Sequence, residues 1–139
     1  MGVSADAPYF DIAYKLVQFD GRPVMKLSTG KVTYVGQKQV CRSYDSRGFM
    51  AGDSIGLRDE AVPAAKPLLE KVMHQGRLLR PPPPLSACRE YCLSEMARLP
   101  QDYKRLSQPP AYPVHISPGL TALQNQVTEQ LRRRELSSL

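Results

Sequence analysis

The first part of the chain alternates hydrophobic and polar residues, which is the pattern of half-buried β-strands. Residues 12–18 (IAYKLVQ) and 23–28 (PVMKLS) both show this pattern. Asp20 and Gly21 lie between them and tolerate the positive φ angles that a tight hairpin needs. The pattern therefore predicts a β-hairpin.

Further strands are expected to extend this hairpin into a sheet. Alternation continues through 31–44 and returns at 49–57, after a DSRG sequence at 45–48 that is typical of a type I turn. Gly52 inside the last run indicates a bulge or strand break. We expect an antiparallel β-meander over about residues 12–57.

Prolines mark residues 63–84 as a connector. Its apolar segment 68–73 fits either a short helix or a strand that ends at Gln75-Gly76, and periodicity does not decide between the two. The sequence RPPPP at 80–84 favours a stiff polyproline II spacer, although such a run can also dock in an aromatic groove.

A helix is predicted over about residues 85–99, because apolar side chains recur at a spacing of three, four, four and three. Pro100 ends it, and a short helical turn at 102–104 follows. The residues on the predicted apolar face are Leu85, Cys88, Cys92, Met96 and Leu99.

A second helix is predicted over about residues 118–134. Three prolines in 108–117 first favour an extended strap across a surface. Ser117 is then a good N-cap, and Pro118 suits the first helical position because its missing N–H costs nothing there.

Together these elements predict an α+β fold in which the meander precedes the helices and proline-rich extended segments join them. A complete (β/α)₈ barrel is excluded, since it needs about 200 residues or more and the chain has 139. We expect a single region, over residues 1–139, that holds three segments. They are a β-rich segment over residues 1–62, a connector over residues 63–84 and a helical segment over residues 85–139.

The amino-acid composition makes the chain basic. The formal net charge is +6, which favours the approach of phosphates, nucleic acid or another anionic partner. No stretch approaches 18 consecutive apolar residues, and the first twenty residues lack the basic start and apolar core of a signal peptide. We expect no membrane partner and a cytoplasmic location.

The three cysteines are an odd number in a chain without a secretory signal, so we expect reduced thiols. Cys88 and Cys92 lie on the predicted apolar face and are expected, like Cys41, to pack as core thiols rather than to bind zinc. His74 and His115 complete neither a metal-binding pattern nor a signature of nucleophilic catalysis.

Other charged motifs also favour structural interpretations. No glycine-rich phosphate loop occurs. Asp59-Glu60 is expected at a solvated edge, and residues 132–134 (three arginines) are expected to face water at a helix end, where they complement the helix dipole. We therefore predict no catalytic, cofactor-binding or metal-binding residue within this chain.

Several strings, in order and at matching spacing, resemble the carboxy-terminal region of nicotinate phosphoribosyltransferase, and the resemblance covers nearly the whole chain. The most specific are YKLV at 14–17 with MKLS at 25–28, GQKQVCR at 36–42 and YPVHIS at 112–117. The resemblance implies an enzyme that joins nicotinate to phosphoribosyl pyrophosphate to form nicotinate mononucleotide for NAD salvage, assisted by ATP and magnesium.

The resemblance also implies that the phosphohistidine, the metal-organising acids and the phosphate loop of the family precede the matched region. Ser4 and Asp6 would lie near the phosphoribosyl end of the site without a catalytic role. Catalysis would then require the barrel and amino-terminal domain, on the same or a second polypeptide, and the chain alone would be inactive. It would also expose apolar surface, including an unpaired edge at residues 12–28. The alternative is a free-standing basic module that binds nucleic acid through residues 132–134.

Overall fold

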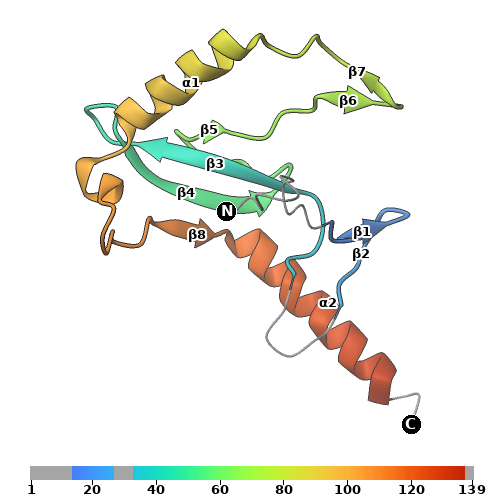
Figure 1. Cartoon of the computed structure of the whole chain (residues 1–139). Coiled ribbons are helices and arrows are strands. Elements are labelled where there is room, and N and C mark those ends of the chain that lie inside the picture. The colour runs from blue at the N-terminus through green and yellow to red at the C-terminus, as the bar shows by residue number, and fades with distance from the viewer. Residues whose placement is uncertain (1–13, 27–32, 137–139) are drawn as a thin grey trace, which may run out of the picture. The chain divides into compact units, whose positions relative to one another are not determined.

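The structure, a computed structural model, describes residues 14–26 and 33–136. The chain divides into two compact units, one formed by Met1–Gly36 with Leu123–Leu139 and the other by Gln37–Ala122. The fold is mixed α+β, as predicted, and the described residues contain antiparallel strands and two long helices but no closed barrel (Figure 1). No helix in the described part of the chain has the length and apolar character needed to cross a membrane.

A four-stranded sheet organises the unit Gln37–Ala122, in the order β5-β3-β4-β8. Its strands are β3 (Lys38–Tyr44), β4 (Met50–Leu57), β5 (Lys66–Pro67) and β8 (Val114–Ile116). β3 pairs antiparallel with both β4 and β5, which confirms this part of the meander. β8 pairs parallel with β4, because the proline-rich strap returns the chain to the outer edge of β4.

The turn between β3 and β4 confirms the DSRG prediction. The Asp45 carboxylate accepts hydrogen bonds from the backbone N–H groups of Arg47 (3.0 Å) and Phe49 (2.8 Å). Gly48 has a φ of 83°, which residues with a side chain rarely adopt. The register then shifts between the pairs Ser43–Gly52 and Tyr44–Met50, so the irregularity lies beside the predicted position.

The connector contains a separate two-stranded ribbon, in which β6 (Met73–His74) pairs antiparallel with β7 (Arg77–Leu78). Gln75 and Gly76 make its turn with φ angles of 48° and 74°. Of the apolar segment 68–73, only Met73 therefore belongs to a strand, and residues 68–72 form neither a helix nor a strand. The proline run that follows is exposed and has no helix or strand.

Both predicted helices form. α1 (Leu85–Arg98) ends before Pro100, and the 3₁₀ helix η1 (Gln101–Lys104) follows it. α2 (Pro118–Leu136) begins at the predicted cap, where the Ser117 hydroxyl accepts a hydrogen bond from the N–H of Leu120 at 3.1 Å.

The predicted burial of Cys88 and Cys92 is wrong, because both thiols are exposed, and only Cys41 of the three cysteines is buried. α1 has no buried residue at all. Helical spacing shows which residues share a face but does not show whether another element covers that face. The buried hydrophobic residues of the described segments are Val35, Cys41, Met50, Leu120 and Val127.

In the other unit, β1 (Gln18–Phe19) and β2 (Arg22–Pro23) confirm the predicted hairpin, with Asp20 and Gly21 at positive φ. The strands are shorter than predicted, and residues 12–13 and 27–32 lie outside the described part of the chain.

The predicted strand at 31–36 is wrong for residues 33–36, which belong to no strand. The N–H of Val35 donates instead to the Gln124 side chain at 3.0 Å, and the N–H of Gly36 donates to the Val17 carbonyl at 2.8 Å. These isolated bonds satisfy the backbone without a ladder.

Candidate functional site

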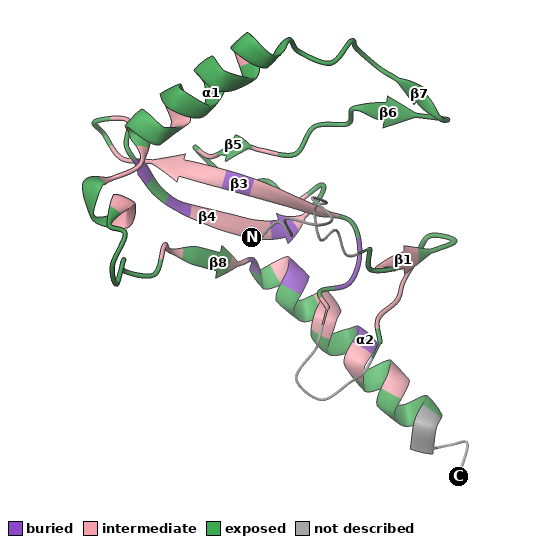
Figure 2. Ribbon diagram, viewed as in Figure 1, coloured by how far each residue is buried: buried purple, intermediate pink, exposed green. Residues whose placement is uncertain are grey.

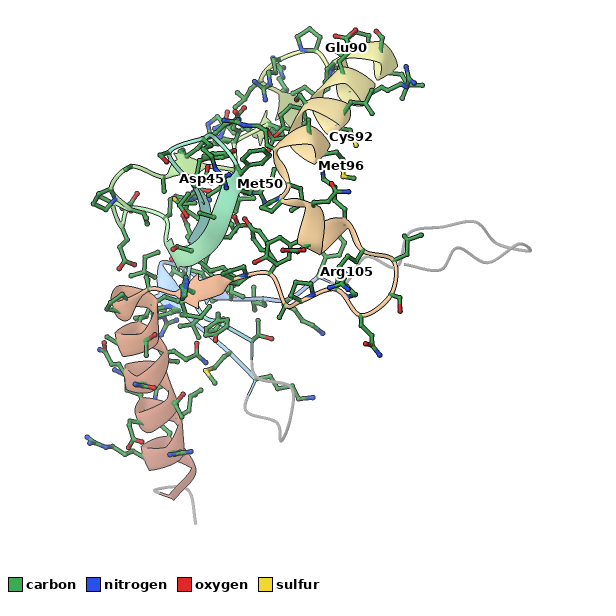
Figure 3. All side chains as sticks on the ribbon, turned by 90° about the vertical axis from the view of Figure 1, so that its left-hand side faces the viewer. Asp45, Met50, Glu90, Cys92, Met96 and Arg105 are labelled. Carbon is green, nitrogen blue, oxygen red and sulfur yellow. The ribbon has the colours of Figure 1, made fainter. Side chains whose placement is uncertain are left out.

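One side of α1 presents a row of uncovered apolar and sulfur-containing side chains, which we call the exposed stripe. Its members are Leu85, Cys88, Cys92 and Met96. Leu85 retains 85% of its accessible surface and Met96 retains 49%. Figure 2 shows α1 exposed along most of its length, and Figure 3 shows Cys92 and Met96 on the side of the helix that faces away from Met50 of β4.

A different face of α1 contacts the sheet. Glu95 is half-buried, and Arg98 forms an ion pair with it at 3.7 Å, one turn away. Leu99, the last residue of the predicted apolar face, follows the end of α1 and is also half-buried. The Arg98 Nε donates to the Gly48 carbonyl at 3.2 Å, and its guanidinium lies 4.1 Å from the centre of the Tyr44 ring. Polar contacts and a cation–π contact therefore hold the helix, while its most apolar side remains uncovered.

Arg42 is the centre of the ion-pair network that anchors α1. Its Nε and Nη2 donate to the two Asp53 carboxylate oxygens at 2.8 and 2.9 Å, and its Nη1 donates to Glu95 of α1 at 3.3 Å. The Tyr112 hydroxyl donates to Asp53 at 3.2 Å. The network thus joins β3, β4, α1 and the strap before β8.

These contacts change the acidity of two groups. The hydrogen bond to Asp53 raises the pKa of Arg42 above its ordinary value, and burial opposes this rise. Burial raises the pKa of Tyr112, and the Asp53 charge adds to that effect. Every charged side chain in the network has an opposite charge as its neighbour, which is the arrangement of a structural clamp rather than of a poised acid–base pair.

Glu60 has a role that the sequence did not indicate. Its carboxylate accepts hydrogen bonds from the Ser117 hydroxyl, the N–H of Leu57 at 3.1 Å and the N–H of Gly119 at 3.2 Å. The prediction of a solvated edge holds for the exposed Asp59 but is wrong for Glu60, which is half-buried. A carboxylate at a helix N-terminus compensates the orphan N–H groups and the helix dipole.

Comparisons with known proteins show which proteins this chain is similar to. A family model described as the nicotinate phosphoribosyltransferase C-terminal domain matches residues 64–124. The nicotinate phosphoribosyltransferase pncB2 of Mycobacterium tuberculosis is 39% identical over 83% of this chain and 25% of that protein. The crystal structure of human nicotinic acid phosphoribosyltransferase has a TM-score of 0.73 and 30% identity, over 84% of this chain and 26% of that chain. This chain matches the carboxy-terminal region of nicotinate phosphoribosyltransferase.

The match covers only a fraction of each relative. The curated nicotinate phosphoribosyltransferase of Homo sapiens is 32% identical over 81% of this chain and 25% of that protein. The chain thus spans about a quarter of the length of such relatives. Residues 64–124, which match the C-terminal domain of nicotinate phosphoribosyltransferase, contain β5, the β6-β7 ribbon, β8 and all of the exposed stripe.

The other candidates from the sequence do not converge on one site. His74 in β6 and His115 in β8 are both exposed. Within the described ranges, no three side chains of His, Cys, Asp or Glu lie close enough together to hold a metal ion. Arg132 pairs with Glu129 one turn away at 3.3 Å and is exposed. Ser4 and Asp6 lie outside the described residues.

Proposed function

We propose that this chain serves as the carboxy-terminal region of a nicotinate phosphoribosyltransferase and packs against a catalytic barrel and amino-terminal domain. The complete enzyme would join nicotinate to phosphoribosyl pyrophosphate with the help of ATP, in the cytoplasm. Nicotinate, phosphoribosyl pyrophosphate, ATP and Mg²⁺ would bind to the complete enzyme, and this chain would supply a docking surface. The remainder would belong to the same polypeptide or to a second subunit.

The observation that carries this proposal is the exposed stripe of α1. A continuous row of apolar side chains is unfavourable on a surface exposed to solvent. Such rows are common where a second protein surface binds and covers them. The stripe lies within the segment that matches the C-terminal domain family. The orientation of α1 is fixed, because Arg42 contacts Glu95 and Tyr44 contacts Arg98 on a neighbouring face of the helix.

The lack of a local catalytic arrangement also supports the proposal. In the described part of the chain, the two histidines are exposed and lie on different sheets, and no three metal-binding side chains cluster. The ionised groups around Arg42 pair with one another. Phosphoribosyl transfer needs groups that stabilise a pyrophosphate leaving group, so these groups would come from the remainder of the enzyme.

A complementation assay tests the proposal. The purified chain is mixed with Mycobacterium tuberculosis pncB2 truncated to remove the quarter that this chain matches, and nicotinate mononucleotide formation is measured. We expect no product from either polypeptide alone and product from the mixture. Product from the 139-residue chain alone would contradict the placement of the catalytic groups, and an inactive mixture would contradict the docking role.

Two variants make the assay specific for the exposed stripe. Met96→Glu places a charge in the stripe and is expected to reduce activity of the mixture at least 10-fold. Ala97→Glu adds the same charge at the adjacent exposed position of α1, outside the stripe, and is the matched control. Equal loss in both variants would show that the stripe itself does not dock.

A further inference from the structure

The helix α1 carries two exposed thiols one turn apart. Cys88 and Cys92 are both free and exposed, and four positions separate them in the sequence. Side chains at this spacing lie on the same side of a helix, with Cβ atoms about 5–6 Å apart. The Cys88 thiol donates only a weak hydrogen bond, to the Pro83 carbonyl at 3.9 Å. The two sulfur atoms are therefore accessible to one small ligand.

The spacing of the two thiols suits a shared metal ion better than a disulfide bond. A disulfide needs Cβ atoms about 3.5–4.5 Å apart, which is closer than a helix places residues four positions apart. Two metal–thiolate bonds of about 2.3 Å each separate the sulfur atoms by up to about 4.6 Å. Cβ atoms about 5–6 Å apart allow this separation, so the intact helix can present both sulfur atoms to one ion.

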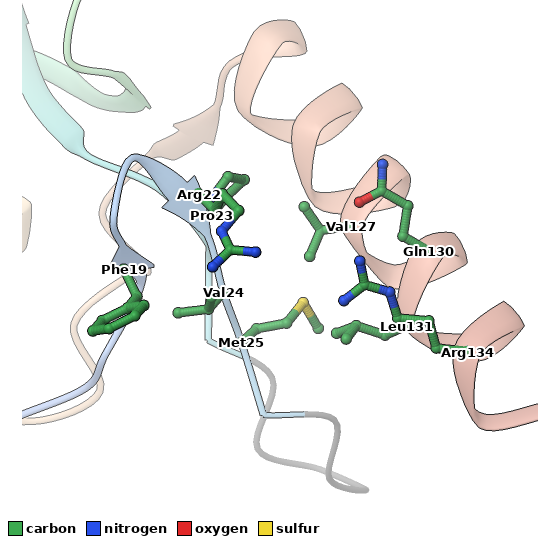
Figure 4. A pocket seen from close by; sticks show the side chains of 9 residues that line it. All are labelled: Phe19, Arg22, Pro23, Val24, Met25, Val127, Gln130, Leu131 and Arg134. Carbon is green, nitrogen blue, oxygen red and sulfur yellow. The ribbon is translucent and has the colours of Figure 1, made fainter. Parts of the chain in front are cut away.

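Other sulfur atoms in the chain are less available to a metal ion. Cys41 and Met50 in the four-stranded sheet are 7% and 6% exposed. In the groove of the other unit, shown in Figure 4, the Met25 sulfur accepts contacts from the Gln124 amide nitrogen at 3.4 Å and the Thr128 hydroxyl at 3.9 Å. Of the three cysteines, only those on α1 are exposed.

The available ligands indicate which ion fits. Structural Zn²⁺ sites need four ligands, and the described residues contain no group of three or more His, Cys, Asp or Glu side chains that could hold an ion. Met96 is eight positions from Cys88, or about 12 Å along the helix axis, which is too far to share an ion with it. Two thiolates alone are soft ligands, and soft ligands select Cu(I) among the transition-metal ions.

We propose that Cys88 and Cys92 form a Cu(I) site in which one ion bridges the two sulfur atoms. Each thiol releases its proton to solvent as its sulfur binds, so one Cu(I) and two thiols give an anionic complex and two protons, without a change of oxidation state. Arg89 places a positive charge within one turn of both thiols, which offsets the charge of the complex. Docking would cover the stripe, so the site belongs to the chain before assembly and does not depend on the proposed function.

Competition with the chromogenic Cu(I) chelator bicinchoninate, in the absence of oxygen, tests the site in the full chain. We expect one Cu(I) ion to bind per chain. Cys88→Ser and Cys92→Ser are each expected to weaken binding at least 100-fold, whereas Met96→Leu should change it less than 3-fold. No binding by the unaltered chain, or binding that both serine variants retain, would overturn the site. A loss in Met96→Leu as large as in the serine variants would overturn the two-thiol ligand set.

A relocated thiol tests whether the spacing on α1 matters. Cys92→Ser combined with Ser94→Cys keeps the number of thiols but places the second one six positions from Cys88, at an exposed position on a different side of the helix. We expect this variant to bind Cu(I) as weakly as Cys92→Ser alone. Affinity restored to that of the unaltered chain would overturn the proposal, because the number of thiols rather than their spacing would then attract the ion.

Discussion

Glu60 and Ser117 are joined by a hydrogen bond across 57 positions of the sequence. Glu60 follows the end of β4, and Ser117 is the cap of α2, so the bond ties the sheet to the start of the helix. The same carboxylate accepts the N–H of Gly119, while the Ser117 hydroxyl accepts the N–H of Leu120. These two side chains thereby accept hydrogen bonds from backbone N–H groups in the first turn of α2 that have no partner within the helix.

This arrangement predicts an acid-sensitive contribution of Glu60 to stability. The Ser117 hydroxyl, followed by the N–H of Leu57, holds the pKa of Glu60 below its ordinary value. The pKa of Glu60 is therefore lower in the folded chain than in the unfolded chain. Glu60 makes its full contribution to the free energy of unfolding above the ordinary glutamate pKa of about 4.3, and this contribution is lost as the pH falls through the pKa of the folded chain. Urea unfolding from about pH 7 to pH 3 measures it.

Glu60→Gln is expected to be less stable at neutral pH and to lose less stability on acidification than the unaltered chain. Asp59→Asn removes the same charge from the exposed neighbour and serves as the control. An acid profile that Glu60→Gln leaves unchanged would show that the carboxylate charge is not what stabilises the start of α2.

Gly119→Ala is predicted to destabilise the chain, although alanine is normally the better helix former. A Cβ at this position would lie 2.9 Å from both Glu60 carboxylate oxygens, so the carboxylate would have to move. Because the displaced carboxylate would lose part of its hydrogen bonding, we expect a loss of about 0.5–1.5 kcal/mol in the free energy of unfolding. In the Glu60→Ala background the same substitution should cost much less, and an equal cost in both backgrounds would contradict the clash.

Arg42→Met is predicted to release α1 from the sheet. The substitution keeps the aliphatic stem but removes the partner of Asp53 and Glu95, whose side chains are only 12% and 15% exposed. We expect a loss of about 2–3 kcal/mol, measured by denaturant unfolding, with faster amide exchange in α1.

Arg47→Met is the control for this prediction. Its ion pair with Asp45 spans 3.4 Å, and the arginine side chain is 78% exposed, so the expected loss is below about 1 kcal/mol. Similar losses in the two variants would show that the Arg42 network contributes no more than a surface pair.

The local elements were predictable because their signals are local. The hairpin residues Asp20 and Gly21, the turn at 45–48 and the Ser117 cap each act within a few residues of their own position. Alternation correctly identified β3 and β4. Only β4 buries residues at even spacing, at Met50, Gly52 and Gly56, whereas β3 is half-buried along its length except at the buried Cys41.

The relationships between distant segments were not predictable from these patterns. Nothing near Glu60 in the sequence indicates that it contacts the start of α2. The parallel pairing of β8 depends on the path of the strap rather than on a turn signal. The stripe from Leu85 to Met96 was correctly predicted as one face, but helical spacing carries no information on which face meets the sheet, and here Glu95 and Arg98 do so.

Thiol reactivity gives a simple measure of the exposed stripe in the isolated chain. Cys88 and Cys92 are exposed, and Cys41 is 7% exposed. Titration with a chromogenic disulfide reagent under native conditions should therefore modify two thiols rapidly, and the third should react only at the rate of unfolding. Rapid reaction of all three thiols would contradict the burial of Cys41 in β3.

The most direct test of the docking role is the reactivity of Cys88 and Cys92 in the assembled enzyme. The chain and the truncated pncB2 are combined, and thiol modification is followed in the active mixture and in the chain alone. The account predicts that assembly slows modification of both thiols at least 10-fold. An active assembly in which both thiols react as fast as in the isolated chain would contradict it.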